Sequence, residues 1–216
     1  MKSNYLFFLL LFTALFSSCD KDGESFEGSD TIIEVVREFS SFDKIIARDA
    51  VEINVIMSET QKVEIVVNDN LQDKLITRVD NNALEILTAD GSYTNARFRV
   101  NIEIPSLVSL QLNDGTAGAV DFTTKDLQIE VDDSSVLALR GSSETLTADV
   151  NDAAKVKAFN FTTDVLNTNC GDASLLEITC NQELNGTVTD AAIVQYMGMP
   201  TINAQTSDEG QIIDAN

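Results

Sequence analysis

Six aspartates recur at near-constant spacing in the second half of the chain. They are the residues whose type and spacing most clearly invite chemistry. Each stands six places after an aliphatic residue, and the intervals between them are 19, 19, 20, 18 and 18 residues. The six are Asp114, Asp133, Asp152, Asp172, Asp190 and Asp208. A column of carboxylates can fix a repeated tight turn, or it can supply oxygen ligands to a row of calcium ions.

The pattern around these aspartates favours the turn. Each repeat offers one carboxylate and no glycine-rich ligand loop, whereas calcium takes six to eight oxygen ligands. Unit charges about 4.8 Å apart repel in water by only roughly 0.9 kcal/mol, so the carboxylates can stack without a bound metal ion to offset their repulsion. We therefore expect a structural corner column in which each carboxylate accepts a hydrogen bond from the backbone N–H two residues on. A calcium ladder is the alternative.

The rest of the inventory predicts no enzyme, cofactor or metal centre. The chain has no histidine and no tryptophan. It also lacks a phosphate-binding glycine loop, a nucleophile elbow and any metal-ligand spacing. The net charge is −21, and lysine and arginine do not cluster. These features argue against binding to nucleic acid and against direct adsorption to anionic lipid, because both need a basic patch.

Three cysteines divide into two kinds. Cys19 follows an apolar leader, whereas Cys170 and Cys180 lie ten residues apart in the fourth repeat. Cys170 takes the place that valine holds in neighbouring repeats, which predicts a small buried side chain. A disulfide between Cys170 and Cys180 stays open, because a sequence does not define the Cα separation that a bridge requires.

The repeats predict strands. Residues alternate in apolar and polar character before each aspartate, two small residues follow the aspartate, and a second apolar pair comes four and six places on. Examples of the first strand are Leu127-Gln-Ile-Glu-Val131 and Leu146-Thr-Ala-Asp-Val150, and examples of the second pair are Leu137 with Leu139 and Val156 with Ala158. A unit this short cannot bury its own apolar face, so the units must stack.

The fold class is therefore all-β, a single-stranded parallel β-helix, or solenoid, with turns of about 18 to 20 residues. The link from the second strand to the next first strand varies in length. A left-handed helix built on hexapeptides would keep strict multiples of six, so the drift favours the right-handed form. The sixth unit is the most polar, and Asp208, Glu209 and Asp214 guard its open edge with charge, so we expect a monomer.

The first residues form a targeting segment. Residues 1–19 contain Lys2, an apolar run from Leu6 to Phe16 and a small-residue end before Cys19. This resembles a bacterial lipobox, which implies cleavage before Cys19, lipidation of that cysteine and attachment to the membrane through the lipid. An ordinary signal peptide cut near Ser18 is the alternative. The acidic stretch at residues 20–24 resembles the export signal of Bacteroidetes-type Gram-negative bacteria, which implies the outer face of the outer membrane.

The rest of the chain comprises a tether and one domain, and no Pro- or Gly-rich linker interrupts that domain. Residues 20–31 lack apolar periodicity and are predicted to be a flexible acidic tether. Residues 32–216 form one solenoid domain, in which 32–106 supply irregular first turns and a cap, and 107–216 supply six regular repeats. Residues 70–79 suit a short helix or a strand equally well.

Several segments in this order resemble a known family. They are Phe42-Asp-Lys-Ile-Ile-Ala47, Val51-Glu-Ile-Asn-Val-Ile56, Val63-Glu-Ile-Val-Val-Asn-Asp-Asn70, Ala83-Leu-Glu-Ile-Leu87 and Val100-Asn-Ile-Glu-Ile-Pro-Ser-Leu-Val-Ser-Leu110. With the lipobox leader and the short β-turns, they resemble the head GIN domain of putative autotransporter adhesins, over roughly residues 38–214. That family usually carries Ser-Gly-Ser at the corner where this chain carries Asp. The resemblance implies a β-helical surface lipoprotein and transfers no catalytic residue.

These observations predict a lipid-anchored cell-envelope protein that acts as an adhesin or surface scaffold. Its ligand, protein or glycan, is not named by the sequence. The competing function is an envelope β-helix protein that binds or cleaves glycan.

Overall fold

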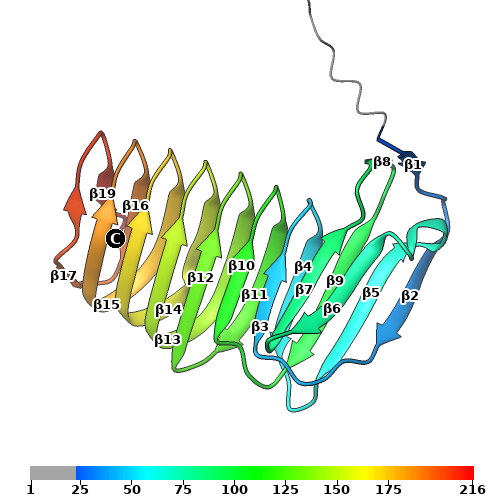
Figure 1. The fold of residues 1–216 in the computed structure, drawn as a ribbon. Coiled ribbons are helices and arrows are strands. Elements are labelled where there is room, and N and C mark those ends of the chain that lie inside the picture. Colours follow the sequence, from blue (N-terminus) through cyan, green and yellow to red (C-terminus); the bar gives the residue numbers. More distant parts are fainter. Residues whose placement is uncertain (1–22) are drawn as a thin grey trace, which may run out of the picture.

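The computed structural model describes residues 23–216, which form an all-β solenoid (Figure 1). The predicted fold class is confirmed, because about six turns stack through parallel pairing at intervals of about 19 residues. Cys19 and the leader lie outside the described residues. No helix within residues 23–216 has the length and hydrophobicity needed to cross a bilayer.

The strands fall into two groups along the chain. The cap and first turns comprise β1 (Ser25–Glu27), β2 (Ile32–Arg37), β3 (Lys44–Ala47), β4 (Glu52–Met57), β5 (Lys62–Asn68), the 3₁₀ helix η1 (Asp69–Leu71), β6 (Leu75–Asp80), β7 (Ala83–Thr88), β8 (Ser92–Thr94) and β9 (Phe98–Ile104). The regular turns comprise β10 (Ser109–Leu112), β11 (Ala117–Thr123), β12 (Asp126–Val131), β13 (Val136–Val150), β14 (Lys155–Cys170), β15 (Leu175–Val188), β16 (Ile193–Met197), β17 (Thr201–Ile202), β18 (Gln205–Thr206) and β19 (Gln211–Asp214).

Each turn runs from a first sheet, through a corner, to a second sheet. The first sheet stacks β6, β7, β3, β10, β12, the later halves of β13, β14 and β15, and then β17 and β18. The second sheet stacks β2, β5, β9, β4, β11, the earlier halves of β13, β14 and β15, and then β16 and β19. Strands β13, β14 and β15 are long because each bends from the second sheet into the first sheet of the next turn.

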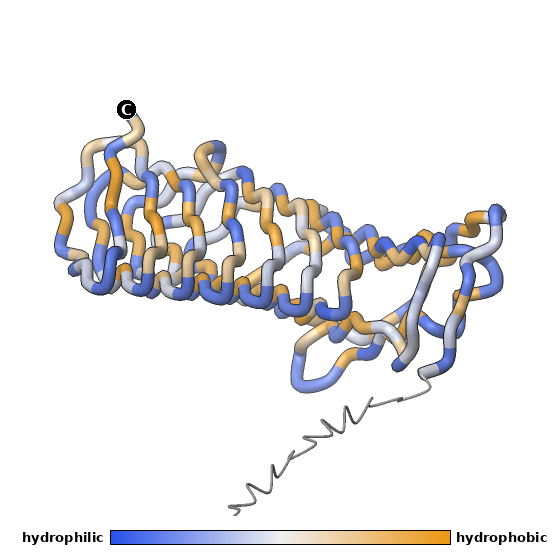
Figure 2. Tube along the Cα trace, turned by 90° about the horizontal axis from the view of Figure 1, so that it is seen from above, coloured by the Kyte–Doolittle hydropathy of each residue, from blue (hydrophilic) through white to orange (hydrophobic). Residues whose placement is uncertain are grey.

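The register places like residues above one another. Leu127 pairs with Leu146, Leu146 with Leu166 and Leu166 with Leu184. All four leucines are buried, with exposed fractions of 2% or less. Figure 2 shows hydrophobic and hydrophilic segments recurring at equivalent places in successive turns. Burying an aliphatic side chain of this size contributes about 1.5–3 kcal/mol, so these columns supply much of the driving force for stacking.

Several polar residues inside the stack bond to the preceding turn, although the buried hydroxyl of Thr116 has no partner within residues 23–216. The hydroxyl of Thr168 donates to the carbonyl of Ala148 at 2.8 Å, and the hydroxyl of Ser174 donates to the carbonyl of Val150 at 2.7 Å. Because both acceptors belong to the preceding turn, these buried hydroxyls add turn-to-turn bonds rather than unsatisfied groups.

The first two turns stack in an order that the sequence does not predict. β3 and β4 pair with β10 and β11 on one side and with β7 and β9 on the other. The turn at residues 83–104 therefore lies outside the turn at residues 44–57, although it comes later in the chain. Antiparallel strands β2, β5 and β6 close this end. The predicted cap is thus an antiparallel extension of the two sheets.

The tether expected up to residue 31 is shorter than predicted. β1 pairs in parallel with β8, and the N–H of Gly28 donates to the carbonyl of Thr94 at 2.9 Å. The side chain of Asn68 donates to the carbonyl of Ser29 at 2.7 Å. Residues 25–29 are therefore bonded to the domain rather than free of it. Residues 70–79, left open between helix and strand, contain the end of η1 and most of β6.

Replacing Val150 by Asp is expected to lower the free energy of unfolding by several kcal/mol. Val150 has an exposed fraction of 0% and lies in a column between Val131 and Cys170, so the new carboxylate would be buried without a partner. The matched control is Thr147→Asp, because Thr147 lies on the same strand with its side chain on the outer face. Chemical denaturation measures both, and equal midpoints would contradict the inward assignment of Val150.

Candidate functional site

The six predicted aspartates lie one above another at the corners between the two sheets. Each has a positive φ, between 49° and 56°, and so does the residue that follows it. All six side chains are exposed. The corners form the pointed row along the upper edge of Figure 1. We call this row of outward carboxylates the corner ridge.

Backbone hydrogen bonds close each corner. The N–H of Ser135 donates to the carbonyl of Asp132 at 3.0 Å, and the N–H of Ala154 donates to the carbonyl of Asn151 in the same way, also at 3.0 Å. Two central residues with positive φ inside such a bond are the signature of a type I′ turn. The prediction that this N–H donates to the aspartate carboxylate is wrong. The N–H donates instead to the backbone carbonyl of the residue that precedes the aspartate. Aspartate suits the corner because it tolerates the left-handed conformation.

A second set of hydrogen bonds joins one corner to the next. The N–H of Ser134 donates to the carbonyl of Asp152 at 2.9 Å, and the N–H of Ala153 donates to the carbonyl of Asp172 at 2.8 Å. The same bond recurs from Ala173 to Asp190 and from Ala191 to Asp208. The corner ridge is therefore part of the backbone ladder that holds the turns together.

The ridge has a seventh member that the sequence reasoning missed. Asp49 and Ala50 have φ of 65° and 56°, and the N–H of Ala50 donates to the carbonyl of Asp114 at 2.9 Å. The sequence does contain part of the repeat pattern here, because the apolar residues Ile45 and Ala47 alternate with other residues before Asp49 as in the repeats. The pattern was hidden because residue 43, six places before, is Asp rather than aliphatic.

The corner ridge offers one exposed carboxylate per turn for binding or catalysis. Within residues 23–216, no group of three or more Asp, Glu, Cys or His side chains is arranged to hold a metal ion. One carboxylate per turn leaves most of the oxygen ligands of a calcium ion to be supplied from elsewhere.

The two described cysteines lie in the core and are not bonded to each other. Cys170 pairs with Val150 and Val188, as its place in the repeat predicts. Burial raises the pKa of the Cys170 thiol to about 11, and burial also raises the pKa of Cys180. Since the thiolate is the reactive form, both groups are suited to packing rather than to nucleophilic chemistry at neutral pH.

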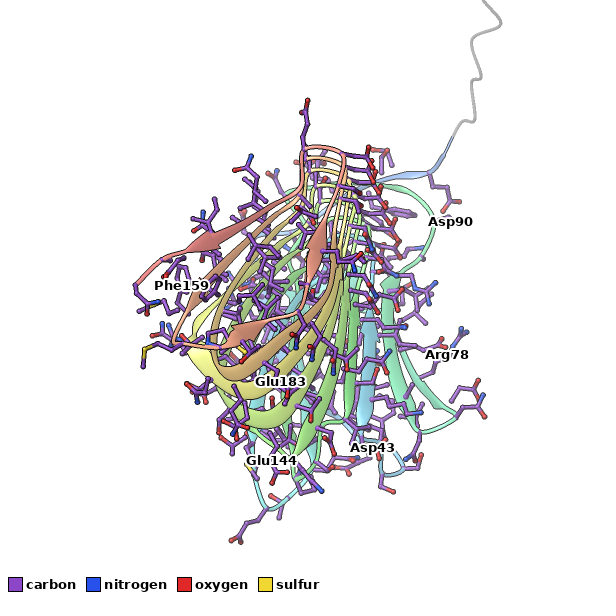
Figure 3. The ribbon with its side chains drawn as sticks, turned by 90° about the vertical axis from the view of Figure 1, so that its left-hand side faces the viewer. Asp43, Arg78, Asp90, Glu144, Phe159 and Glu183 are labelled. Carbon is purple, nitrogen blue, oxygen red and sulfur yellow. The ribbon has the colours of Figure 1, made fainter. Side chains whose placement is uncertain are left out.

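A hollow of about 180 Å³ is lined by the ridge member Asp49 together with Thr88, Ala89, Asp90 and Gly91. Two larger hollows lie on the outer faces of the sheets, away from the ridge. One, of about 280 Å³, lies on the second sheet over β4, β11 and β13, where small Ala119 and Ala138 stand between Ile56 and Arg140. The other, of about 300 Å³, lies on the first sheet beside Val108, Gln128 and Thr147. Figure 3 looks along the solenoid and separates the two sheets, with Arg78 on the first and Phe159 on the opposite side.

Substitutions at Asp152 test why aspartate occupies the corners. Asp152→Asn and Asp152→Gly are expected to keep the free energy of unfolding within about 0.5 kcal/mol, because both residues accept positive φ. Asp152→Val is expected to lower it by about 1–2 kcal/mol, since a β-branched residue is strained in that conformation. Thermal and chemical denaturation measure the series.

The glycine variant separates the explanations, because it removes the carboxylate and keeps the backbone freedom. If Asp152→Gly destabilised as much as Asp152→Val, the carboxylate itself would be needed. Melting after chelation and again with millimolar calcium is the companion measurement. A large rise in the melting temperature with calcium would contradict the conformational account.

Alkylation of the core thiols is expected to be slow in the folded protein. In a Cys19→Ser chain, iodoacetamide at pH 8 meets only Cys170 and Cys180. Their raised pKa keeps both thiols protonated until the pH rises towards the folded-state value. Unfolding in denaturant should speed the reaction at least roughly tenfold by restoring an ordinary thiol pKa and exposing the sulfur. Equal rates in the folded and unfolded protein would contradict the burial of these groups.

Comparison with known proteins identifies the family. The family described as putative auto-transporter adhesin, head GIN domain, matches residues 41–200. Among curated proteins, none matches the chain significantly.

Three solved structures share the fold at low sequence identity. A putative adhesin from Bacteroides fragilis has a TM-score of 0.72 and 16% identity, and the match covers 87% of this chain and 98% of that one. A putative adhesin from Parabacteroides merdae has a TM-score of 0.57 and 12% identity, covering 90% and 100%. A putative lipid binding protein from Parabacteroides distasonis has a TM-score of 0.56 and 14% identity, covering 89% and 100%. With the solenoid and its corners in place, the match over residues 41–200 means that the chain belongs to the head GIN domain family of putative auto-transporter adhesins.

Proposed function

We propose that this protein is a lipid-anchored adhesin on the surface of a Bacteroidetes-like Gram-negative cell. The observation that carries the proposal is the match to an adhesin family across most of the domain. Solved relatives in fold from Bacteroides and Parabacteroides are also described as putative adhesins. The proposal assigns no reaction to the chain and no cofactor.

Anchoring through Cys19 is supported by the leader before it and by the start of the domain after it. Only residues 20–24 separate Cys19 from β1, whose pairing with β8 ties it to the domain. Six extended residue steps reach at most roughly 20 Å. A lipid on Cys19 would therefore keep the capped end of the solenoid close to the membrane. The acidic residues after Cys19 support export to the outer face.

Adhesion suits the shape of the domain better than catalysis does. The solenoid presents two long outer faces on a backbone held by parallel pairing, which is how repeat proteins build extended binding surfaces. Acidic side chains are spread over that surface, and the net charge of −21 favours solubility and disfavours nucleic acid as a partner. We take the protein to act as a monomer whose ligand is a protein or glycan outside the cell.

Replacing Cys19 by Ser tests the anchor and the function together. The variant is expected to leave the outer-membrane fraction or to stay uncleaved, because the lipid is attached through a thioether bond that needs the cysteine sulfur. Cells that express it should attach less well to host or bacterial surfaces than cells with the native chain. Membrane fractionation, labelling with radioactive palmitate and an attachment assay are the measurements.

Cys170→Ser is the control, because it changes a cysteine in the core and leaves the leader intact. If the Cys19→Ser protein were cleaved, labelled and membrane-bound like the native chain, the lipoprotein assignment would fail. If it were released while attachment stayed unchanged, the adhesin assignment would fail instead.

A further inference from the structure

The outer face of the first sheet changes character in its last three turns. The column at residues 165, 183 and 201 holds Val165, Glu183 and Thr201, whereas the two columns beside it form a surface that holds only amides and one hydroxyl. We call this surface the amide face, and it consists of Asn167, Asn169, Asn185, Thr187, Asn203 and Gln205. Two of the six residues are half-buried and four are exposed. In a chain with 35 acidic residues, such a surface is a local exception.

Register makes the amide face a regular array. Asn167 pairs with Asn185, and Asn169 pairs with Thr187, which in turn pairs with Gln205. Parallel strands lie about 4.8 Å apart, so each column repeats at that distance along the axis. The two columns stand two residues apart along each strand, which is about 6.6 Å.

Hydrogen bonds along the axis hold these side chains in place. The amide of Asn203 donates to Oδ1 of Asn185 at 2.9 Å, and the amide of Asn185 donates to Oδ1 of Asn167 at 3.3 Å. In the other column, the hydroxyl of Thr187 donates to Oδ1 of Asn169 at 3.0 Å. Ordering these rotamers before a ligand arrives removes part of the entropy cost of binding.

The ladder leaves part of the hydrogen-bonding capacity of these side chains unused. A primary amide has two N–H donors and an oxygen with two lone pairs. Asn203 uses one donor in the ladder, and Oδ1 of Asn167 and of Asn185 each accept one bond. Asn185 also donates to Oε2 of Glu183 at 3.4 Å, and Asn169 donates to Oδ1 of Asp149 at 2.9 Å. Within residues 23–216, the donors that stay unused are therefore those of Asn167 and Gln205 and one each on Asn169 and Asn203. Such donors beside acceptor oxygens match adjacent sugar hydroxyls.

The charges nearby select against other ligand classes. Asp149 and Glu183 border the amide face, and no lysine or arginine occurs after Lys157. Lys155 and Lys157 lie on the earlier half of β14, in the second sheet. An anionic ligand would therefore meet repulsion without a cation to bind it. An apolar ligand would find no apolar side chain among the six.

We propose that the amide face binds a neutral, hydroxyl-rich polysaccharide, and this inference rests on the proposed adhesin function. Without tryptophan in the chain, no indole ring adds stacking to the hydrogen bonds, so a single sugar unit binds weakly. Many copies of the lipid-anchored protein on one cell would act together on one polymer. A second copy of this chain is the competing occupant of the face.

Binding to immobilised yeast mannan, dextran and galactomannan tests the inference, with polygalacturonate as the anionic comparison. The chain from residue 20, displayed in many copies on beads, should bind at least one neutral polymer more tightly than polygalacturonate. Asn185→Asp should weaken that binding roughly tenfold, because it replaces a donor at the centre of the ladder by a charge. Thr187→Val, which adds no charge, should weaken it in the same direction.

Gln195→Glu is the matched control, since it makes the same amide-to-acid change on the outer face of the second sheet. It should bind like the native chain, and melting curves should confirm that all three variants are folded. In a folded protein, failure to bind any neutral polymer, or equal loss in Gln195→Glu, would overturn the inference. So would a stable dimer by light scattering that Asn185→Asp dissociates, because the second copy would then occupy the face.

The outcome is separable from that of the proposed function. If cells lose attachment when the gene is deleted but recover it fully with the Asn185→Asp chain, adhesion stands and the glycan assignment fails. If purified protein binds neutral glycan while deletion leaves attachment unchanged, the glycan site stands and the adhesin function fails.

Discussion

Parallel backbone pairing between successive turns is the constraint on which the rest of this structure depends. In the regular turns, each strand must present its N–H and C=O groups to the strands stacked on either side of it, so insertions are confined to the bends. The same constraint places equivalent residues in columns. Inside, the columns are filled by aliphatic side chains such as Leu146 and Leu166, both with an exposed fraction of 0%. At the corners, the carbonyl of one aspartate accepts the bond from the turn before it.

The sequence predicted the parts of the fold that this pairing dictates. Alternation over residues 127–131 and 146–150, together with the spacing of Asp133 and Asp152, identified the strands, their register and the corners between them. It did not predict why aspartate occupies the corners. A carboxylate hydrogen bond and a positive φ both favour Asp, and only the backbone geometry distinguishes them.

Other features could not be predicted because several segments have similar patterns and could pair with the same strand. Residues 51–55 and 100–104 have the same alternation, so either segment suits a neighbour of β11, and the structure selects the earlier one. The short pairing of β1 with β8 rests on three residues without apolar periodicity. The asparagine column was visible in the aligned repeats at Asn167, Asn185 and Asn203, but its axial hydrogen bonds become meaningful only once the register is known.

Separation of inner and outer columns also explains how one fold can serve recognition. Inward packing and backbone pairing maintain the stack, so the side chains at outward positions such as Asn169 and Thr187 are free to suit a ligand. The central claim is that exposed corners hold the turns together through backbone hydrogen bonds, and native-state amide hydrogen exchange tests it most directly. The amides of Ser134, Ala153, Ala173 and Ala191, which donate to the next corner, should be protected as strongly as strand amides. The adjacent amides of Asp133, Asp152, Asp172 and Asp190, which donate to no backbone or side-chain acceptor within residues 23–216, should exchange far faster. Fast exchange at both sets of amides would contradict the account.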